Sequence, residues 1–193
     1  MKGHDFVYNE WNRGMLVLND SVFSKQDYLK YDALNDRVLI KGSNNSNEIM
    51  NITDRTLTGF SILDVTKNLK HDFVKLNGAH FKDNAASGFY EIIFNLSNTN
   101  YFIKKNKKII FDPNRSKGTM AINNLPLEYK DNNSYYIKNS EGLYANVRLN
   151  KKSIKSVLTK NILKVNEFIK INKIKFKSEQ DVMKLVNYYY SIE

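Results

Sequence analysis

Few side chains in this chain are of the kinds that carry out covalent or metal chemistry. Cysteine is absent, which excludes disulfides, thiolate metal sites and cysteine nucleophiles. The three histidines, His4, His71 and His80, are far apart in the sequence and fit neither an HExxH nor an HxH spacing. We therefore expect them to lie at the surface or at strand ends, and we expect neither a metal nor a cofactor.

No motif for acyl, phosphoryl or hydride transfer is present. The sequence contains no G-x-S-x-G, no G-x-x-x-x-G-K-[ST] and no G-x-G-x-x-G. Carboxylates such as Glu91 and Glu128 could serve a glycosidase if the fold brought them together, but Glu91 also fits the polar position of an alternating strand. These absences favour a protein that is not an enzyme.

Lysines near the C-terminus are the strongest candidates for a binding role. Residues 151–177 contain nine lysines and one acid, Glu167, in a chain of net charge +10. Such a run can be a solvated helical face, or it can contact an acidic partner or an anionic membrane. Arginine and glutamine are missing from the run, so specific nucleic-acid binding is not expected. We name Lys155, Lys160 and Lys164 as candidate partner contacts.

Three consecutive tyrosines, Tyr188, Tyr189 and Tyr190, are the second candidate for partner contact. Successive residues of a helix point in different directions, so the three rings cannot all enter one core. Either they pack at the edge of the core, or at least one ring contacts another chain, where tyrosine is favoured.

The elements that position these residues fall into two parts. Residues 1–150 alternate with period two between turn signals, which predicts an antiparallel β domain, built as a meander that forms a curled sheet or a partly closed barrel. The expected strands are Gly14–Leu18, Val22–Tyr31, Arg37–Lys41, Glu48–Ile52, Gly59–Leu63, Asp72–Leu76, Gly88–Leu96, Tyr101–Lys105, Lys107–Phe111, Leu127–Lys130, Tyr135–Lys138 and Leu143–Leu149. Residues 42–47 and 114–124 are expected to be loops.

The hydrophobic period changes near Asn150. Apolar residues at i, i+3 and i+4 predict two or three short amphipathic helices within residues 151–193, with Ser178 as an N-cap. We expect this basic segment to be a subdomain packed on the β domain. Lys173–Lys177 alternates and is expected to be an extended link.

Composition limits the location of the protein. Hydrophobic residues make up 41% of the chain, enough for a core, but no apolar run approaches the roughly 18–20 residues of a membrane-spanning helix. The opening residues, Met1–Phe6, contain no apolar signal-peptide region. These features are compatible with a cytoplasmic protein, or with an exported one from which a signal has been removed.

Three segments carry a resemblance to a known group of proteins. They are G-M-L-V-L-N-D at Gly14–Asp20, Y-D-A-L-N-D at Tyr31–Asp36, and the tail F-I-K-I-N-K-I-K-F-K-S-E-Q-D-V-M-K-L-V-N-Y-Y at Phe168–Tyr189. The chain resembles a family of uncharacterised exported envelope proteins of Bacteroidota, flavobacteria especially, that combine a β-rich body with a Lys-rich helical tail. The resemblance implies a location in the periplasm or at the periphery of the outer membrane after removal of a signal, with the cytoplasm as the alternative, and it supplies no catalytic residues. It also implies that Ser21, in Asp20-Ser21-Val22, is a candidate O-glycosylation site.

Together these features predict a non-enzymatic cell-envelope protein that binds another protein, as an accessory subunit of an outer-membrane-associated assembly. The first alternative is a β-barrel that binds a small molecule or a lipid. The second is an envelope enzyme that acts on glycans.

Overall fold

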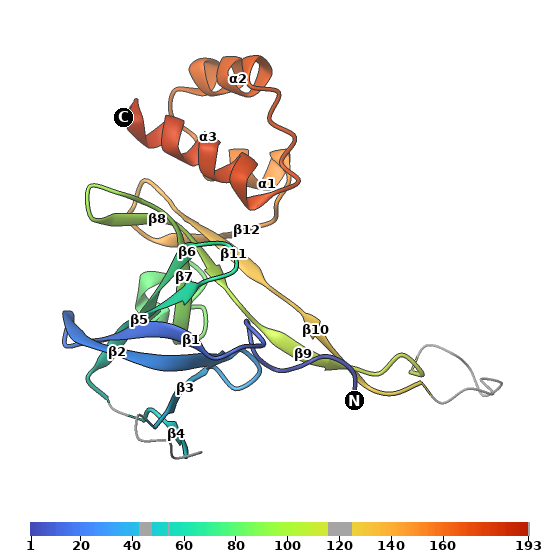
Figure 1. The fold of residues 1–193 in the computed structure, drawn as a ribbon. Helices are drawn as coiled ribbons and strands as arrows, with labels where there is room; N and C mark the ends of the chain where they lie inside the picture. The colour runs from blue at the N-terminus through green and yellow to red at the C-terminus, as the bar shows by residue number, and fades with distance from the viewer. Residues whose placement is uncertain (43–47, 54, 116–124, 193) are drawn as a thin grey trace. The chain divides into compact units, whose positions relative to one another are not determined.

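The computed structural model describes residues 1–42, 48–53, 55–115 and 125–192, and of residues 22–26 it describes the backbone only. The mainly antiparallel β fold followed by helices is confirmed (Figure 1). The strands are β1 Asn12–Leu18, β2 Ser21–Asp32, β3 Arg37–Lys41, β4 Ile49–Asn51, β5 Leu57–Asp64, β6 Leu69–Leu76, β7 Gly88–Leu96, β8 Thr99–Lys105, β9 Lys108–Phe111, β10 Glu128–Asp131, β11 Ser134–Lys138 and β12 Tyr144–Val147. Of the loops expected at residues 42–47 and 114–124, residues 43–47 and 116–124 lie outside the described residues.

The strand order is not that of a simple meander. Ten strands form one antiparallel sheet in the order β12-β11-β8-β7-β6-β5-β1-β2-β3-β4, while β9 and β10 form a separate pair. β5 therefore returns to lie beside β1, as in a Greek key, and β11 lies beside β8. The order ends in two different strands, so the ten-stranded sheet is open, consistent with the curled sheet expected from the sequence.

The chain divides into two compact units. The first contains Met1–Asp72 and Asn106–Asn133, and the second contains Phe73–Lys105 and Ser134–Glu193. Strands give way to helices at Asn150, as expected, because β12 ends at Val147 and α1 begins at Lys151. The division into units does not follow that change: the helices belong with β7, β8, β11 and β12.

In the second unit both faces of the strands are buried. One face contributes Phe102 and Ile137 to a core with the apolar sides of helices α1 (Lys151–Lys155), α2 (Ile162–Ile171) and α3 (Glu179–Ser191). The other face contributes Tyr90, Ile103 and Tyr144 to a smaller cluster with Phe81. Phe81 follows a short 3-10 helix, η1 (Gly78–His80), that the sequence analysis did not predict.

Helix α3 begins and packs as its sequence pattern predicts. The Ser178 side chain accepts a hydrogen bond from the Asp181 backbone N–H, and Glu179 and Asp181 occupy the first turn. The helix contacts β7 and β8 (Figure 1). Before it, Ile174 and Phe176 are buried and the neighbouring lysines are exposed, so the expected alternation is confirmed. The segment is not regularly extended, however, because Lys173 and Phe176 have positive φ.

Two hairpin turns of the first unit each begin with an aspartate and share one hydrogen-bond pattern. The Asp32 carboxylate accepts backbone hydrogen bonds from Leu34 and Asn35 at 3.1 and 3.0 Å, and the turn ends at Asp36 with φ 55°. The Asp64 carboxylate, at the end of β5, accepts backbone hydrogen bonds from Thr66 and Lys67, and Asn68 in this turn has φ 50°. Short polar residues tolerate this left-handed conformation, so the chain can reverse at both turns without a glycine.

Asp32 is fully buried and is held as an anion. Burial by itself would raise the pKa of its carboxyl, but hydrogen bonds from Asn35 and Arg37 outweigh burial and bring the pKa below its ordinary value. The Arg37 Nε atom lies 2.7 Å from Asp32 Oδ2. A buried carboxylate with this many donors fixes the β2–β3 turn.

Replacing Asp32 by Asn should reduce the free energy of unfolding by about 2 kcal/mol, because charge-assisted hydrogen bonds are lost. Since the pKa of Asp32 is lowered by folding, its contribution is present above the ordinary carboxyl pKa of 3.8 and is lost as the pH falls below it. Urea unfolding of D32N between pH 7 and pH 3 should therefore depend less on pH than that of the wild type. The exposed Asp83→Asn is the control and should behave like the wild type.

Gly14 marks the closest approach between β1 and its neighbours. A Cβ atom at this position would lie 2.3 Å from the Ser61 carbonyl oxygen of β5 and 2.7 Å from Leu29 Cδ1 of β2. The β1–β2 register also shifts between Gly14 and Leu16, which is a bulge. The pairing of β5 with β1 thus depends on the absence of a side chain at residue 14.

Gly14→Ala should lower the free energy of unfolding by about 3 kcal/mol, because a backbone oxygen cannot move away as a side chain can. Gly78→Ala is the matched control. Its Cβ would meet Asn84 Oδ1 at 2.1 Å, the end of a flexible side chain, and the expected loss is below about 1 kcal/mol. Equal losses in chemical denaturation of the two variants would contradict this account.

Candidate interaction surface

The candidate residues of the C-terminal segment lie on three helices that contact each other, except Lys160, which lies between α1 and α2. The Asn150 side chain caps α1 by accepting from the Ser153 backbone N–H at 2.9 Å. The Lys155 Nζ atom donates to Asn166 Oδ1 at 2.8 Å and so joins α1 to α2. Lys155 is therefore half-buried and has a structural contact, whereas Lys160 and Lys164 are exposed.

The three tyrosines contact three different parts of the second unit. Tyr189 is 2% exposed and belongs to the main core, and its hydroxyl accepts from the Lys160 backbone N–H. Tyr188 stacks on Phe168 of α2 with ring centroids 4.1 Å apart. Tyr190 stacks on Tyr101 of β8 at 3.8 Å and donates to the Lys138 carbonyl. Contact of these tyrosines with another chain stays a prediction, and only Tyr188 and Tyr190, which are half-buried, have ring surface left for it.

Helix α2 exposes large apolar side chains. Leu163 is 85% exposed, Ile171 69% and Ile162 51%, although Val165 and Ile169 of the same helix are buried. Ile171 follows Leu163 by eight residues, so the two side chains lie on one helical face. Ile162 precedes Val165 by three residues, a spacing that predicts an inward position, but it is exposed.

Lysines surround these apolar side chains. Lys160 precedes α2, Lys164 follows Leu163, and Lys170 precedes Ile171, and all three are exposed. We call this set the α2 surface: Lys160, Ile162, Leu163, Lys164, Lys170 and Ile171. A hollow of about 400 Å³ at its N-terminal end is lined by Thr159, Asn161, Ile162, Leu163 and Lys164.

A buried ion cluster holds α3 against the sheet. The Lys104 Nζ atom lies 2.9 Å from Glu179 Oε1 and 3.6 Å from Glu91 Oε2, and the Tyr135 hydroxyl donates to Glu179 at 2.8 Å. Burial would lower the pKa of the Lys104 ammonium, but attraction by Glu91 and the hydrogen bond to Glu179 raise it above its ordinary value. The sequence analysis missed this cluster, whose members come from β7, β8, β11 and α3.

The other chemical candidates are placed as follows. Glu91 faces Lys104 in the second unit, while Glu128 belongs to the first unit and lies 3.7 Å from Lys130. His80 shares a capping box with Asn77. Within the part of the chain that the structure describes, no three His, Asp or Glu residues gather in a way that could hold a metal ion.

The candidate glycosylation site lies at an exposed hairpin. Asn19 and Asp20 both have positive φ, as a two-residue turn of type I′ requires, and Ser21 is the exposed first residue of β2. Its modification stays a prediction.

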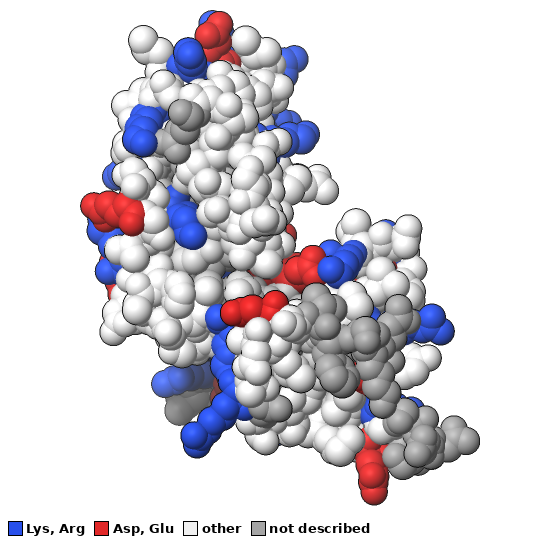
Figure 2. Space-filling view, turned by 90° about the vertical axis from the view of Figure 1, so that its left-hand side faces the viewer, with Lys and Arg blue, Asp and Glu red and all other residues white. Residues whose placement is uncertain are grey.

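Comparison of the chain with protein-family models, with curated proteins and with solved structures found no match. Among the described residues, no helix combines the length and the apolar character needed to cross a membrane. Charged side chains on the face shown in Figure 2 form separate groups among uncharged ones.

Glu179→Gln should reduce the free energy of unfolding by about 1–2 kcal/mol, because Lys104 then has one carboxylate in place of two. Asp181→Asn is the matched control: it removes a charge from the same first turn of α3 but no contact with Lys104. Its effect should stay within about 0.5 kcal/mol. Similar values for the two variants in urea denaturation would mean that the helix dipole, and not the ion cluster, explains the role of Glu179.

Proposed function

We propose that this chain is a non-enzymatic protein that binds another protein through the α2 surface, and that the partner offers acidic side chains around an apolar patch. The observation that carries the proposal is the 85% exposure of Leu163 beside exposed lysines. A large apolar side chain so fully in water has no structural use in its own chain, and exposed apolar groups rimmed by polar ones are typical of interaction sites.

The apolar side chains would supply most of the affinity. Removing a leucine or isoleucine side chain from water contributes about 1.5–3 kcal/mol, and Leu163 and Ile171 could both be covered by one partner. The exposed lysines would contribute less to affinity and more to the rate of association and to the choice of an acidic partner.

The frame behind the α2 surface is suited to binding without rearrangement. Tyr188 stacks on Phe168, Lys155 bonds to Asn166, and the Lys104 cluster anchors α3. A surface that is ordered before binding loses less conformational entropy when the partner arrives.

The ion cluster also supports a non-enzymatic role. Glu91, the carboxylate that could have served a glycosidase, faces the Lys104 ammonium instead of an open cleft and is 5% exposed. A general acid or base must reach its substrate within hydrogen-bond distance.

The location that fits this proposal is the periplasm or the periphery of the outer membrane, where the partner would belong to a membrane-associated assembly. This part rests on the resemblance of the three sequence segments given above. A protein of net charge +10 would favour an acidic partner there.

The test compares two sets of variants in co-purification from cross-linked native membranes. Leu163→Ser with Ile171→Ser removes the apolar part of the α2 surface, and Lys164→Glu with Lys170→Glu reverses its charge. Both sets should lose the partner at least tenfold, with unfolding free energies within about 0.5 kcal/mol of the wild type, because these side chains are exposed. Lys155 is left unchanged because of its bond to Asn166.

Lys107→Glu, an exposed reversal in the first unit, is the control and should retain the partner. Raising the salt concentration should weaken the wild-type complex, since exposed charges are screened. Recovery of the wild-type protein only as a free monomer, or equal recovery of the partner with all variants, would contradict the proposal.

A further inference from the structure

A row of side chains crosses six strands of the first unit and alternates between cationic and apolar residues. Arg13 of β1 pairs with Tyr28 of β2, Tyr28 pairs with Lys41 of β3, and Lys41 pairs with Ile49 of β4. On the other side of β1, where Gly14 pairs with Ile62 of β5, Leu63 of β5 and Lys70 of β6 line the same hollow as Arg13 and extend the row. We call these six residues the cross-strand band: Lys70, Leu63, Arg13, Tyr28, Lys41 and Ile49.

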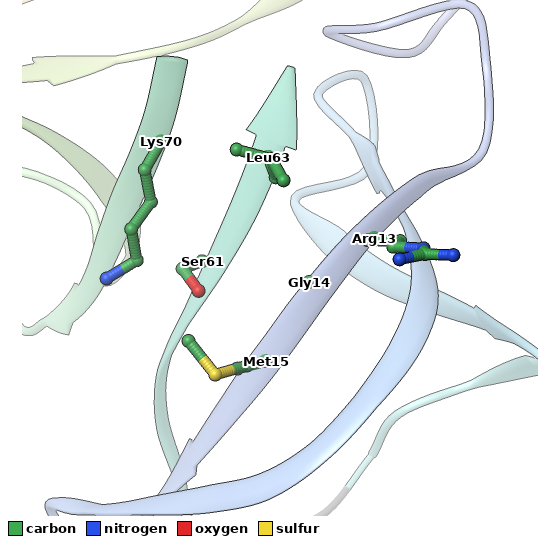
Figure 3. A pocket seen from close by; sticks show the side chains of 6 residues that line it. All are labelled: Arg13, Gly14, Met15, Ser61, Leu63 and Lys70. Atoms are coloured by element: carbon green, nitrogen blue, oxygen red, sulfur yellow. The ribbon is translucent and has the colours of Figure 1, made fainter. Parts of the chain in front are cut away.

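A shallow hollow links strands β1, β5 and β6 of the band. It has a volume of about 170 Å³ and is lined by Arg13, Gly14, Met15, Ser61, Leu63 and Lys70. Figure 3 shows Lys70 on one side, Ser61, Leu63 and Met15 in the middle, and Arg13 on the far side of β1 from Lys70. The band and the hollow thus belong to one continuous strip of sheet.

The band lies on the open face of these strands. Ile49 is 59% exposed, Tyr28 48% and Leu63 36%, whereas Leu29 and Ile62, the next residues along β2 and β5, are fully buried. The next outward position of β2 is different: the Lys30 ammonium lies 4.6 Å from the Phe6 ring centroid and 5.3 Å from that of Trp11. The N-terminal segment therefore contacts the neighbouring row and leaves the band accessible.

The cations recur at a fixed interval. Lys70, Arg13 and Lys41 lie on β6, β1 and β3, which are every second strand in the sheet order. Strands are about 4.8 Å apart, so neighbouring cations of the band are separated by roughly 10 Å. An occupant that contacts all three must be long and must carry negative charges at a similar interval.

We propose that the cross-strand band binds a linear acidic polysaccharide that runs across the strands. Its carboxylates would pair with Lys70, Arg13 and Lys41, with the Arg13 guanidinium suited to bidentate contact. The C–H face of a sugar ring would pack on Tyr28, and Leu63 and Ile49 would contact the apolar faces of further rings. A polysaccharide with a carboxylate on every second sugar fits the alternation of cations and apolar side chains better than one with a carboxylate on every sugar.

The geometry favours this occupant over nucleic acid. B-DNA carries one phosphate on each strand per about 3.4 Å of helix axis, a charge density well above that of the band. Proteins that bind single strands stack successive bases on several aromatic rings, and this row contains one, Tyr28. Lys70 also lies 2.7 Å from Asp72, an exposed ion pair of small energy that a ligand carboxylate can replace.

The test is a calorimetric titration of the full chain at low salt with hyaluronan oligosaccharides, which carry one carboxylate per disaccharide. Polygalacturonate oligosaccharides, with one carboxylate per sugar, should bind more weakly, and neutral dextran should not bind. Arg13→Glu should weaken hyaluronan binding at least tenfold and Tyr28→Ala about fivefold. Lys107→Glu, the same charge reversal away from the band, should change it less than twofold.

Milder substitutions separate a loss of binding from a loss of folding. Arg13→Gln and Lys41→Gln should each weaken binding severalfold while the thermal unfolding temperature stays that of the wild type. Absence of hyaluronan binding, an equal loss in the Lys107→Glu control, or tighter binding to oligo(dT) or to phosphatidylglycerol vesicles than to hyaluronan would each overturn the proposal. None of these results depends on the protein partner of the α2 surface, because the variants lie in the other unit.

Discussion

Burial of both faces of β8 is the constraint on which the second unit depends. Phe102 and Ile103 are adjacent, point to opposite faces, and are both fully buried. One face must therefore be covered by the helices and the other by the cluster around Phe81. A strand buried on both sides cannot tolerate loss of either cover, since apolar surface and backbone groups would meet water. The helices are thus part of the core that these strands require.

The sequence predicted the strands well because their signal is local. Each expected strand overlaps an observed one, and Arg37–Lys41 and Gly88–Leu96 have the expected bounds. Turn chemistry explains this success, since Asn19-Asp20 has the residue types that a two-residue turn requires. The strand order could not be predicted in the same way. Pairing of β5 with β1 depends on the close approach at Gly14, a contact between residues almost fifty positions apart that no periodicity records.

The candidate site was predicted only in part, again for physical reasons. Helical geometry required the three tyrosines to point apart, and they do find three separate contacts. Amphipathic spacing identifies which residues could face a core, but not how wide that core is. Val165 and Ile169 fill the space under α2, and Ile162 and Leu163 are left outside it. The Lys104 cluster was missed because its three charges become partners only when β7, β8 and α3 are assembled.

The two proposed surfaces use lysine in different ways because their supports differ. On a helix, side chains three, four, seven and eight positions apart share a face, so the lysines of α2 surround a compact apolar patch that suits a folded protein. On a sheet, one residue per strand forms a row, so the cations of the cross-strand band, on every second strand, lie along a line at twice the strand spacing. A line of charges fits a linear polymer, whereas charges around an apolar patch fit the surface of a folded protein. The secondary structure beneath each set of cations therefore decides what kind of partner that surface can recognise.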